Sequence, residues 1–319
     1  MPYLALTGGV GGAKLALGLS RLLSPDALRI VANTADDFVH LGLNISPDLD
    51  TVMYTLADIS NKDLGWGLAE ESWQFMEAME RLGGETWFRL GDRDLATHIY
   101  RSHWLAEGKQ LDEITEDLCR KLGVRHSLFP MTNDRVSTRV NLKDGGQLSF
   151  QHYFVRDRCL PEVSGFEFAE IERAKASRPF LEALEEVTGA IIICPSNPFV
   201  SVAPLLQLPG VVERIRQSDI PVVAVSPIVG GQAIKGPAAK MMAELGMPRT
   251  ALAVAAHYAD CYGVRHQGGL FTHFVMDQQD IAQEAAVRQL GFKTRVTQTI
   301  MQTLEDRVEL ARQVLAFVD

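Results

Sequence analysis

Residues Leu4–Lys14 read LALTGGVGGAK, an apolar run that breaks into four glycines and ends at a lysine. An apolar strand that passes through a Gly-rich turn into a helix, here expected over Ala13–Leu23, brings backbone N–H groups to a helix N-terminus, where a phosphate binds well. Without a Cβ, the backbone of the turn can approach a ligand closely, and Lys14 adds positive charge. The glycines of this turn are Gly8, Gly9, Gly11 and Gly12. The stretch predicts a loop for a nucleotide phosphate.

The spacing of these glycines matches neither common nucleotide-binding pattern. Lys14 occupies the third glycine position of G-x-G-x-x-G, and no Ser or Thr follows it as G-x-x-x-x-G-K-[ST] requires. An NAD(P)-dependent oxidoreductase is therefore disfavoured. The sequence NTADD after the second predicted strand leaves open whether this chain has the carboxylate that binds a ribose in such enzymes. A tight turn without a ligand is the alternative reading.

Further apolar runs alternate with helical patterns along the chain. Strands are predicted at Tyr3–Thr7, Leu28–Asn33, Ala190–Cys194 and Val222–Val225. The nearly continuous apolar character of the second and third is typical of parallel strands covered on both faces. With helices at Glu70–Leu82 and Val211–Gln217, the pattern predicts one α/β domain over residues 1–319, a doubly wound, mostly parallel sheet. Residues 60–130 are predicted to form a mostly helical cap on it.

Two segments stand apart from this alternation. Val136–Val155 alternates as a β-hairpin does, with its turn at Asp144-Gly145-Gly146. The closing segment, Thr303–Val318, is expected to be a helix for packing or dimer contact. Its predicted apolar stripe is Leu304, Val308, Ala311, Leu315 and Val318.

Bulk composition is that of a soluble enzyme. The net charge of −9 among 319 residues, with no long basic run, argues against general nucleic-acid binding. Four scattered cysteines suggest reduced thiols in a cytoplasmic protein and no structural zinc. We expect neither a signal peptide nor a membrane span.

Carboxylates gather after the second predicted strand. Asp36, Asp37, Asp48 and Asp50 fall within fifteen residues, at the sheet edge where ligands of α/β proteins bind. Oxygen ligands beside a phosphate site are what Mg²⁺ requires, so the cluster predicts a magnesium site. Helix caps and Asx turns are the plainer alternative for any one of these residues.

Two later loops also follow predicted strands and carry polar groups or glycines. Cys194–Ser201 offers Ser196, Asn197 and Ser201 in a turn stiffened by Pro198. The sequence SPIVGGQAIKGP, after the strand at Val222–Val225, offers Gly230, Lys235 and Gly236 for a second phosphate.

Two more polar segments are candidates for a second substrate. They are Leu90–His98, which reads LGDRDLATH, and Pro130–Thr138, which reads PMTNDRVST. Asp92 can equally serve as a helix cap. Among the isolated histidines, His152 is the strongest functional candidate, whereas a core or surface role is expected for His98 and His257.

These motifs together resemble the 2-phospho-lactate transferases of coenzyme F-420 biosynthesis, nearly end to end. The matching strings are GGVGGAK (Gly8–Lys14), NTADD (Asn33–Asp37), PDLDTVMYTL (Pro47–Leu56), GDRDLATH (Gly91–His98), FQHYFV (Phe150–Val155), PSNPFVS (Pro195–Ser201) and the SPIVGGQAIKGP loop. The resemblance implies transfer of a phospho-acid from a guanosine-diphospho donor to the ribityl hydroxyl of the deazaflavin Fo, with release of GMP. It also implies a Rossmann-like fold, Mg²⁺ and a homodimer. The acid stays open among 2-phospho-L-lactate, phosphoenolpyruvate and 3-phosphoglycerate.

The resemblance also suggests roles for particular residues. Metal ligands are expected at Asp36 and Asp50, with Asp37 and Asp48 as alternatives, and catalytic carboxylates at Asp36, Asp37 and Asp92. Donor-binding residues are expected to be Gly8, Gly9, Gly11, Gly12, Lys14, Ser196, Asn197, Pro198, Ser201, Gly230, Lys235 and Gly236. Fo-binding residues are expected to be Asp92, Arg93, Thr97, Met131, Thr132, Asp134, Arg135 and His152. A nucleotide-sugar-binding regulatory protein of the same fold is the alternative function.

Overall fold

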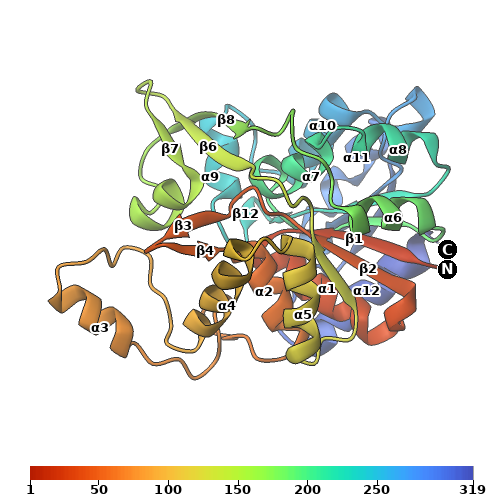
Figure 1. Ribbon diagram of the computed structural model, residues 1–319. Helices are drawn as coiled ribbons and strands as arrows, with labels where there is room; N and C mark the ends of the chain where they lie inside the picture. Colours follow the sequence, from red (N-terminus) through yellow and green to blue (C-terminus); the bar gives the residue numbers. More distant parts are fainter. Residues whose placement is uncertain (319) are drawn as a thin grey trace.

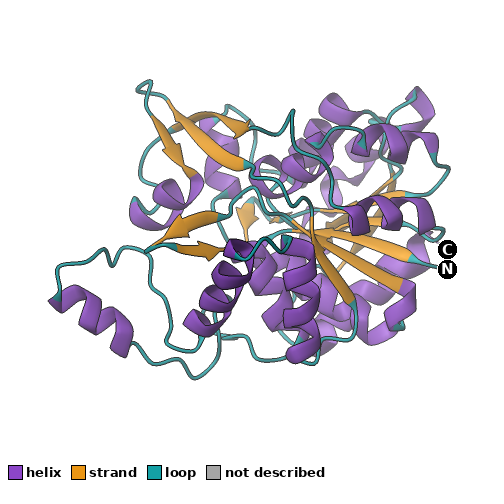
Figure 2. Cartoon of the chain, in the orientation of Figure 1, coloured by secondary structure: helices purple, strands orange, loops and turns teal. Residues whose placement is uncertain are grey.

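A seven-stranded, wholly parallel sheet forms the centre of the computed structural model, which describes residues 1–318 (Figures 1 and 2). The last residue of the predicted 1–319 domain lies outside the described part. The strand order is β14 (Lys293–Thr297), β13 (His273–Asp277), β10 (Val222–Val225), β9 (Ile191–Ile193), β1 (Tyr3–Thr7), β2 (Leu28–Ala32) and β5 (Ser127–Pro130). The predicted doubly wound α/β fold is confirmed.

The chain leaves β1 in one direction through β2 and β5, then returns to build the other half from β9 outward. The order therefore reverses between β1 and β9, whose register pairs Leu6 with Ile193. A crevice opens outside the carboxyl ends of parallel strands at such a reversal, and ligands of open α/β sheets bind there.

Helices cover both faces of this sheet. Side chains alternate along β1, so Leu4 and Leu6 enter one core while Tyr3 and Ala5 enter the other. The helices are α1 (Gly9–Leu22), α2 (Pro47–Leu56), α3 (Gln74–Arg81), α4 (Asp94–Ala106), α5 (Leu111–Lys121), α6 (Arg178–Glu186), α7 (Ala203–Gln207), α8 (Val211–Gln217), α9 (Ala238–Glu244), α10 (Ala251–Tyr262), α11 (Glu284–Gln289) and α12 (Leu304–Val318). The second core also contains residues of α1, α2, α5 and α12, and the first contains residues of α6, α7, α8 and α10.

Smaller strands form separate sheets outside the central one. A three-stranded antiparallel sheet has the order β7 (Gln147–Ser149), β6 (Ser137–Leu142) and β8 (Val163–Ala169). Two hairpins pair β3 (Phe38–His40) with β4 (Leu43–Ile45) and β11 (Ile228–Val229) with β12 (Gln232–Ala233). Helices α3, α4 and α5 lie within residues 60–130, and α3 projects from the body at the left of Figure 1. Among residues 1–318, no helix combines the length and apolar character needed to cross a bilayer.

Several predicted boundaries were wrong. Helix α1 begins at Gly9 rather than Ala13, because the glycines form its first turn. Helix α3 begins at Gln74 rather than Glu70, which has a positive φ of 56° and so cannot lie in a right-handed helix. The hairpin predicted to Val155 ends at Ser149, and residues His152–Arg156 form a π-turn.

Strands β3, β4, β5, β8, β11, β12, β13 and β14 were not predicted. Leu304, which is 39% exposed, also does not belong to the buried face of α12, which centres on Leu310, Ala311 and Val314. This face packs on α1 at Gly18, where an added Cβ would lie 2.0 Å from the Arg307 carbonyl oxygen. The predicted packing role of this helix is confirmed.

Candidate functional site

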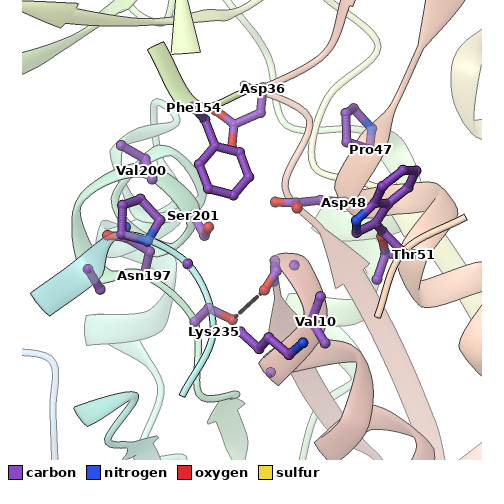
Figure 3. Close-up of a pocket in the computed structure, with 18 of the residues that line it drawn as sticks. Val10, Asp36, Pro47, Asp48, Thr51, Phe154, Asn197, Val200, Ser201 and Lys235 are labelled. Carbon is purple, nitrogen blue, oxygen red and sulfur yellow. Dashed lines mark hydrogen bonds between the residues drawn. The ribbon is translucent and has the colours of Figure 1, made fainter. Parts of the chain in front are cut away.

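One large cavity, of about 590 Å³, lies at the carboxyl ends of the central strands, beside the reversal between β1 and β9. Its walls come from the segments that follow β1, β2, β9, β10 and β14. Figure 3 shows Asp36 and Phe154 at the upper edge of this cavity, Lys235 and Val10 at the lower edge, and Asp48 between them. Polar lining residues are Lys14, Asp36, Asp48, Asp50, Thr51, Tyr54, Arg89, Asp94, His98, Gln151, Ser196, Asn197, Ser201, Ser226, Lys235 and Thr299.

The Gly-rich turn lies where the sequence predicted it, between β1 and α1, and Gly8, Gly9, Gly11 and Lys14 line the cavity. Gly9 has a φ of 62°, which a residue with a side chain rarely adopts. Gly11 packs on the loop after β9, since a Cβ there would lie 2.3 Å from the Pro195 carbonyl oxygen. Gly12 lies behind the turn against Thr7 and does not line the cavity. The N-terminus of α1, a fourteen-residue helix, therefore faces the cavity.

The loop after β9 forms the opposite side of this turn. Ser196 donates to the Gly8 carbonyl oxygen (2.9 Å) and accepts from the Gly8 N–H (3.1 Å). Asn197 accepts from the Phe199 N–H and so caps the next turn, while Ser201 also lines the cavity. The side chain of Pro198 is buried, and this residue does not line the cavity.

Lys14 is held by the segment that follows β14. Its Nζ donates to the Met301 carbonyl oxygen at 2.7 Å. Burial and the nearby Arg307 and Lys235 lower the pKa of Lys14. Lys235 and Gly236 also line the cavity, whereas Gly230 lies outside it and donates its N–H to Asp280.

Two of the predicted carboxylates, Asp36 and Asp48, share one hydrogen-bond donor. The Asn33 side-chain amide contacts Asp36 Oδ2 (3.2 Å) and Asp48 Oδ2 (3.0 Å). Burial raises the pKa of Asp48 to about 6, and burial and the charge of Asp48 raise that of Asp36 well above its usual range. Asp48 also adjoins the Gly-rich turn, since a Cβ on Gly8 would lie 2.8 Å from its Oδ2.

The other two predicted carboxylates have different partners. Asp50 forms a buried, bidentate ion pair with Arg101, although its side chain still borders the cavity. Asp37 accepts from the Ser46 hydroxyl (2.5 Å) and does not line the cavity. The structure therefore brings Asp36 together with Asp48, not with Asp50. Among residues 1–318, no three His, Cys, Asp or Glu side chains gather into a preformed metal centre.

Sequence reasoning missed a carboxylate–histidine pair in the wall of the cavity. His98 Nε2 lies 3.3 Å from Asp94 Oδ2, and the Tyr54 hydroxyl donates to Asp94 Oδ1 (2.5 Å). Burial favours the neutral acid, but His98, Tyr54 and Arg101 outweigh it and hold the pKa of Asp94 below its usual value. The i, i+4 spacing within DLATH was the available signal, because it places both side chains on one face of a helix.

Asp92 serves instead as a helix cap. It accepts hydrogen bonds from the Ser72 hydroxyl and from the Gln74 and Phe75 N–H groups at the start of α3. Glu71 in turn accepts from the first N–H groups of α4. The residues that precede each helix therefore cap the other one. Asp92 lies outside the cavity.

The other residues predicted to bind Fo also lie outside the cavity. Met131 and Thr97 are buried, Thr132 donates to the Lys175 carbonyl oxygen, and Asp134 accepts from the Lys175 N–H. Arg93 donates to the Ala69 carbonyl oxygen, Arg135 is exposed, and His152 packs on Trp87 with ring centroids 4.7 Å apart. Of this set, His152 packs its ring against the cavity-lining Trp87.

Four aromatic side chains, not predicted from the sequence, form one wall of the cavity. Trp87 and Phe88 meet edge to face, and Phe150 stacks on Phe154 with centroids 5.5 Å apart. All four line the cavity. Gln151, between the two stacked rings in sequence, donates to the Asp36 carbonyl oxygen at 3.4 Å, so this wall adjoins the carboxylates. Sequence reasoning missed it because Trp87 and Phe88 lie in an irregular loop.

Comparisons with known proteins show which family and fold this chain shares. The chain is 39% identical to the phosphoenolpyruvate transferase of Streptomyces coelicolor over 326 aligned residues, covering 100% of this chain and 98% of that protein. It is 37% identical to the 2-phospho-L-lactate transferase of Methanosarcina mazei, covering 97% and 98%. A solved structure of a UPF0052 family protein from Bacillus halodurans superposes with a TM-score of 0.67 at 16% identity, over 98% of each chain, and so shares the fold. Residues 4–314 match the family described as 2-phospho-L-lactate transferase CofD, and this chain belongs to that family.

Proposed function

We propose that this protein transfers a phospho-acid from a guanosine-diphospho donor to the ribityl hydroxyl of Fo and releases GMP. Family membership supports a phospho-acid transferase of coenzyme F-420 biosynthesis. The observation that carries the finer proposal is the single cavity that joins a phosphate loop, two adjacent carboxylates and an aromatic wall. These three parts correspond to a diphosphate, a metal and a flat tricyclic acceptor.

The donor diphosphate is proposed to bind at the N-terminus of α1. The N–H groups of the first turn and the helix dipole favour an anion there, and the exposed Lys235 adds charge. The Ser196 hydroxyl braces the turn from the loop after β9. Asp48 borders the same turn, and its negative charge opposes a phosphate. A cation between Asp48 and the diphosphate would remove that repulsion.

Asp36 and Asp48 fit Mg²⁺ for this reason. Mg²⁺ is bound by one or two protein carboxylates together with substrate phosphates and waters, so two adjacent carboxylates beside a phosphate loop are a sufficient donor set. When bound, the metal would neutralise charge on the diphosphate and on the departing GMP. Asp50 is less suited, because the Arg101 guanidinium already neutralises it.

Fo is proposed to lie against the aromatic wall of Trp87, Phe88, Phe150 and Phe154. Flat aromatic ligands gain from offset stacking on such rings. Asp94 is the carboxylate we propose to accept a hydrogen bond from the ribityl hydroxyl, because it borders the cavity and its charge is stabilised by His98 and Tyr54. An oriented hydroxyl presents its lone pair to the phosphorus that is attacked.

The test is an end-point assay with Mg²⁺, Fo and each guanosine-diphospho acid in turn, read by product mass. We expect a gain of one phospho-acid on Fo with one of the donors, and no product when the metal is chelated. No product with any donor, from protein that binds GDP normally, would reject the transferase proposal.

A matched pair of variants tests the acceptor side. Asp94→Asn is expected to lower kcat by about a hundredfold, within the range for a lost proton-accepting group. Asp92→Asn, two residues away and outside the cavity, is expected to change mainly the stability of the α3 segment. Equal kcat losses in both variants would count against Asp94.

We also propose that the protein is a cytoplasmic homodimer. Its four cysteines are free thiols, in keeping with a reducing compartment. Light scattering of the purified chain tests the dimer directly.

A further inference from the structure

Two buried carboxylates near the carboxyl end of β13 have no role in the proposed chemistry. Asp277 is fully buried and accepts three hydrogen bonds: from the Gln279 N–H (3.0 Å), the Thr299 N–H (2.7 Å) and the Thr299 hydroxyl (3.0 Å). Burying a carboxylate is costly unless its oxygens are well hydrogen-bonded, as they are here. Two of the three bonds fix one residue of the segment that follows β14.

That segment forms part of the cavity wall. Thr299, Ile300 and Met301 all line the cavity, and the Met301 carbonyl oxygen accepts from Lys14 Nζ at 2.7 Å. A series of contacts therefore runs from Asp277 through Thr299 and Met301 to the lysine beside the phosphate loop. Asp277 itself does not line the cavity.

Asp280 holds a second segment of the cavity wall in the same way, the one that carries Lys235. Its Oδ2 accepts from the Gly230 N–H at 3.1 Å, and Gln283 donates to its Oδ1 at 2.9 Å. Gly230 has a φ of 56° and lies in the turn between β11 and β12. The chain that follows this hairpin carries Lys235 to the cavity. Both segments are thus hydrogen-bonded to carboxylates at the end of β13 and in the 3-10 helix Gln278–Gln283 that follows it.

We propose that Asp277 and Asp280 are positioning residues for donor binding, an inference that rests on the proposed function. A lysine side chain has many rotamers, and each one lost on binding weakens affinity. A lysine already held by the Met301 carbonyl presents its charge to the donor with less entropy left to lose. Asp277 sets the position of that carbonyl through Thr299, and Asp280 sets the path of the Lys235 loop.

The inference predicts a kinetic split that a purely structural carboxylate would not give. Asp277→Asn leaves one acceptor oxygen and points an NH₂ group at either Gln279 or Thr299, so one set of bonds is lost. We expect the donor KM to rise about tenfold, with kcat and the KM for Fo unchanged within about twofold. Asp280→Asn is expected to show the same split. A fall in kcat or in the active fraction, with the donor KM unchanged, would overturn the inference.

Thr299 supplies a milder pair of variants in case Asp277→Asn fails to fold. Thr299→Val removes the hydroxyl and keeps the shape of the side chain, whereas Thr299→Ser keeps the hydroxyl. The valine variant is expected to raise the donor KM severalfold and the serine variant to match the wild type. Equal donor KM values in the two variants would contradict the proposal.

A double-mutant cycle tests whether the effect passes through Lys14. Lys14→Met removes the group that Asp277 positions, so in that background Asp277→Asn or Thr299→Val is expected to have little further effect on donor KM. Additive effects would reject the connection between them.

Calorimetry with GDP as the probe separates this inference from the proposed function. If the wild type binds no GDP, the proposed function fails. If the wild type binds GDP and the Asp277→Asn or Thr299→Val variant binds it equally well, the positioning inference alone fails. We expect weaker binding by the Asp277→Asn and Thr299→Val variants than by the wild type and Thr299→Ser.

Discussion

Neutralising Asp48 is expected to stabilise the ligand-free protein while abolishing transfer. Asp48 lies beside Asp36 and the Gly-rich turn, and its hydrogen bonds come from the Asn33 amide and the Gly9 N–H. Burial outweighs these hydrogen bonds and raises its pKa from 3.8 to about 6. The ionised form is therefore less favourable in the folded protein than in the unfolded chain. Asp48→Asn removes that charge with little change in shape.

The sign and size of the effect follow from this pKa. A carboxyl group with a raised pKa gives its full contribution to stability below pH 3.8 and loses it as the pH rises through about 6. At about pH 8 the loss is roughly 3 kcal/mol, because each pKa unit corresponds to about 1.4 kcal/mol. For 319 residues, 1 kcal/mol moves the Tm by about 1.5 °C. Asp48→Asn is thus expected to raise the Tm by about 4 °C at pH 8 and by little at pH 4.

The assay is thermal unfolding of the metal-free, ligand-free protein, in a chelator, across this pH range. Asp63→Asn, at an exposed position in the same half of the chain, serves as the control and is expected to follow the wild type. The reasoning is refuted if the wild-type and Asp48→Asn curves run parallel with pH, or if the variant is the less stable protein at pH 8. Transfer activity of Asp48→Asn is measured alongside and is expected to be lost.

Three further changes test other parts of the site. Gly11→Ala is expected to cost about 1–3 kcal/mol and to weaken donor binding, because the new methyl group meets the Pro195 carbonyl; chemical unfolding and GDP titration measure the two effects. Arg101→Met leaves Asp50 buried without its partner and is expected to cost about 3–5 kcal/mol, most of which the double variant with Asp50→Leu recovers in the same unfolding assay. Trp87→Ala removes part of the aromatic wall and is expected to raise the KM for Fo about tenfold without changing the donor KM, as steady-state kinetics would show.

The sequence alone located the part of the cavity that we propose binds the donor. The segments at Gly8–Lys14, Asn33–Asp37 and Pro195–Ser201 each follow an apolar strand closely, and the structure brings parts of all three to one cavity. Parallel strands end at a common edge, so residues close after such strands must meet there whatever the loops do. The run of isoleucines in β9 and the alternation that predicted β6 and β7 were likewise readable without a structure.

The aromatic side of the cavity, which we propose binds Fo, could not be located in this way. Phe88 lies in an irregular loop, Asp94 lies at the start of α4, and Phe154 lies in a turn of π-helix sixty residues further along the chain, so no strand end aligns them. The same holds for the pairing of carboxylates: Asp36, Asp48 and Asp50 are equivalent by spacing, and Arg101 decides among them by neutralising Asp50 from another helix. Composition and periodicity predicted four of the seven central strands, their covered faces and the Gly-rich turn, because these depend on local backbone preferences and burial. Only the tertiary structure decided which polar groups face the cavity and which are hydrogen-bonded elsewhere. This depends on partners from other segments of the chain, as for Asp92 with α3 and Asp277 with Thr299.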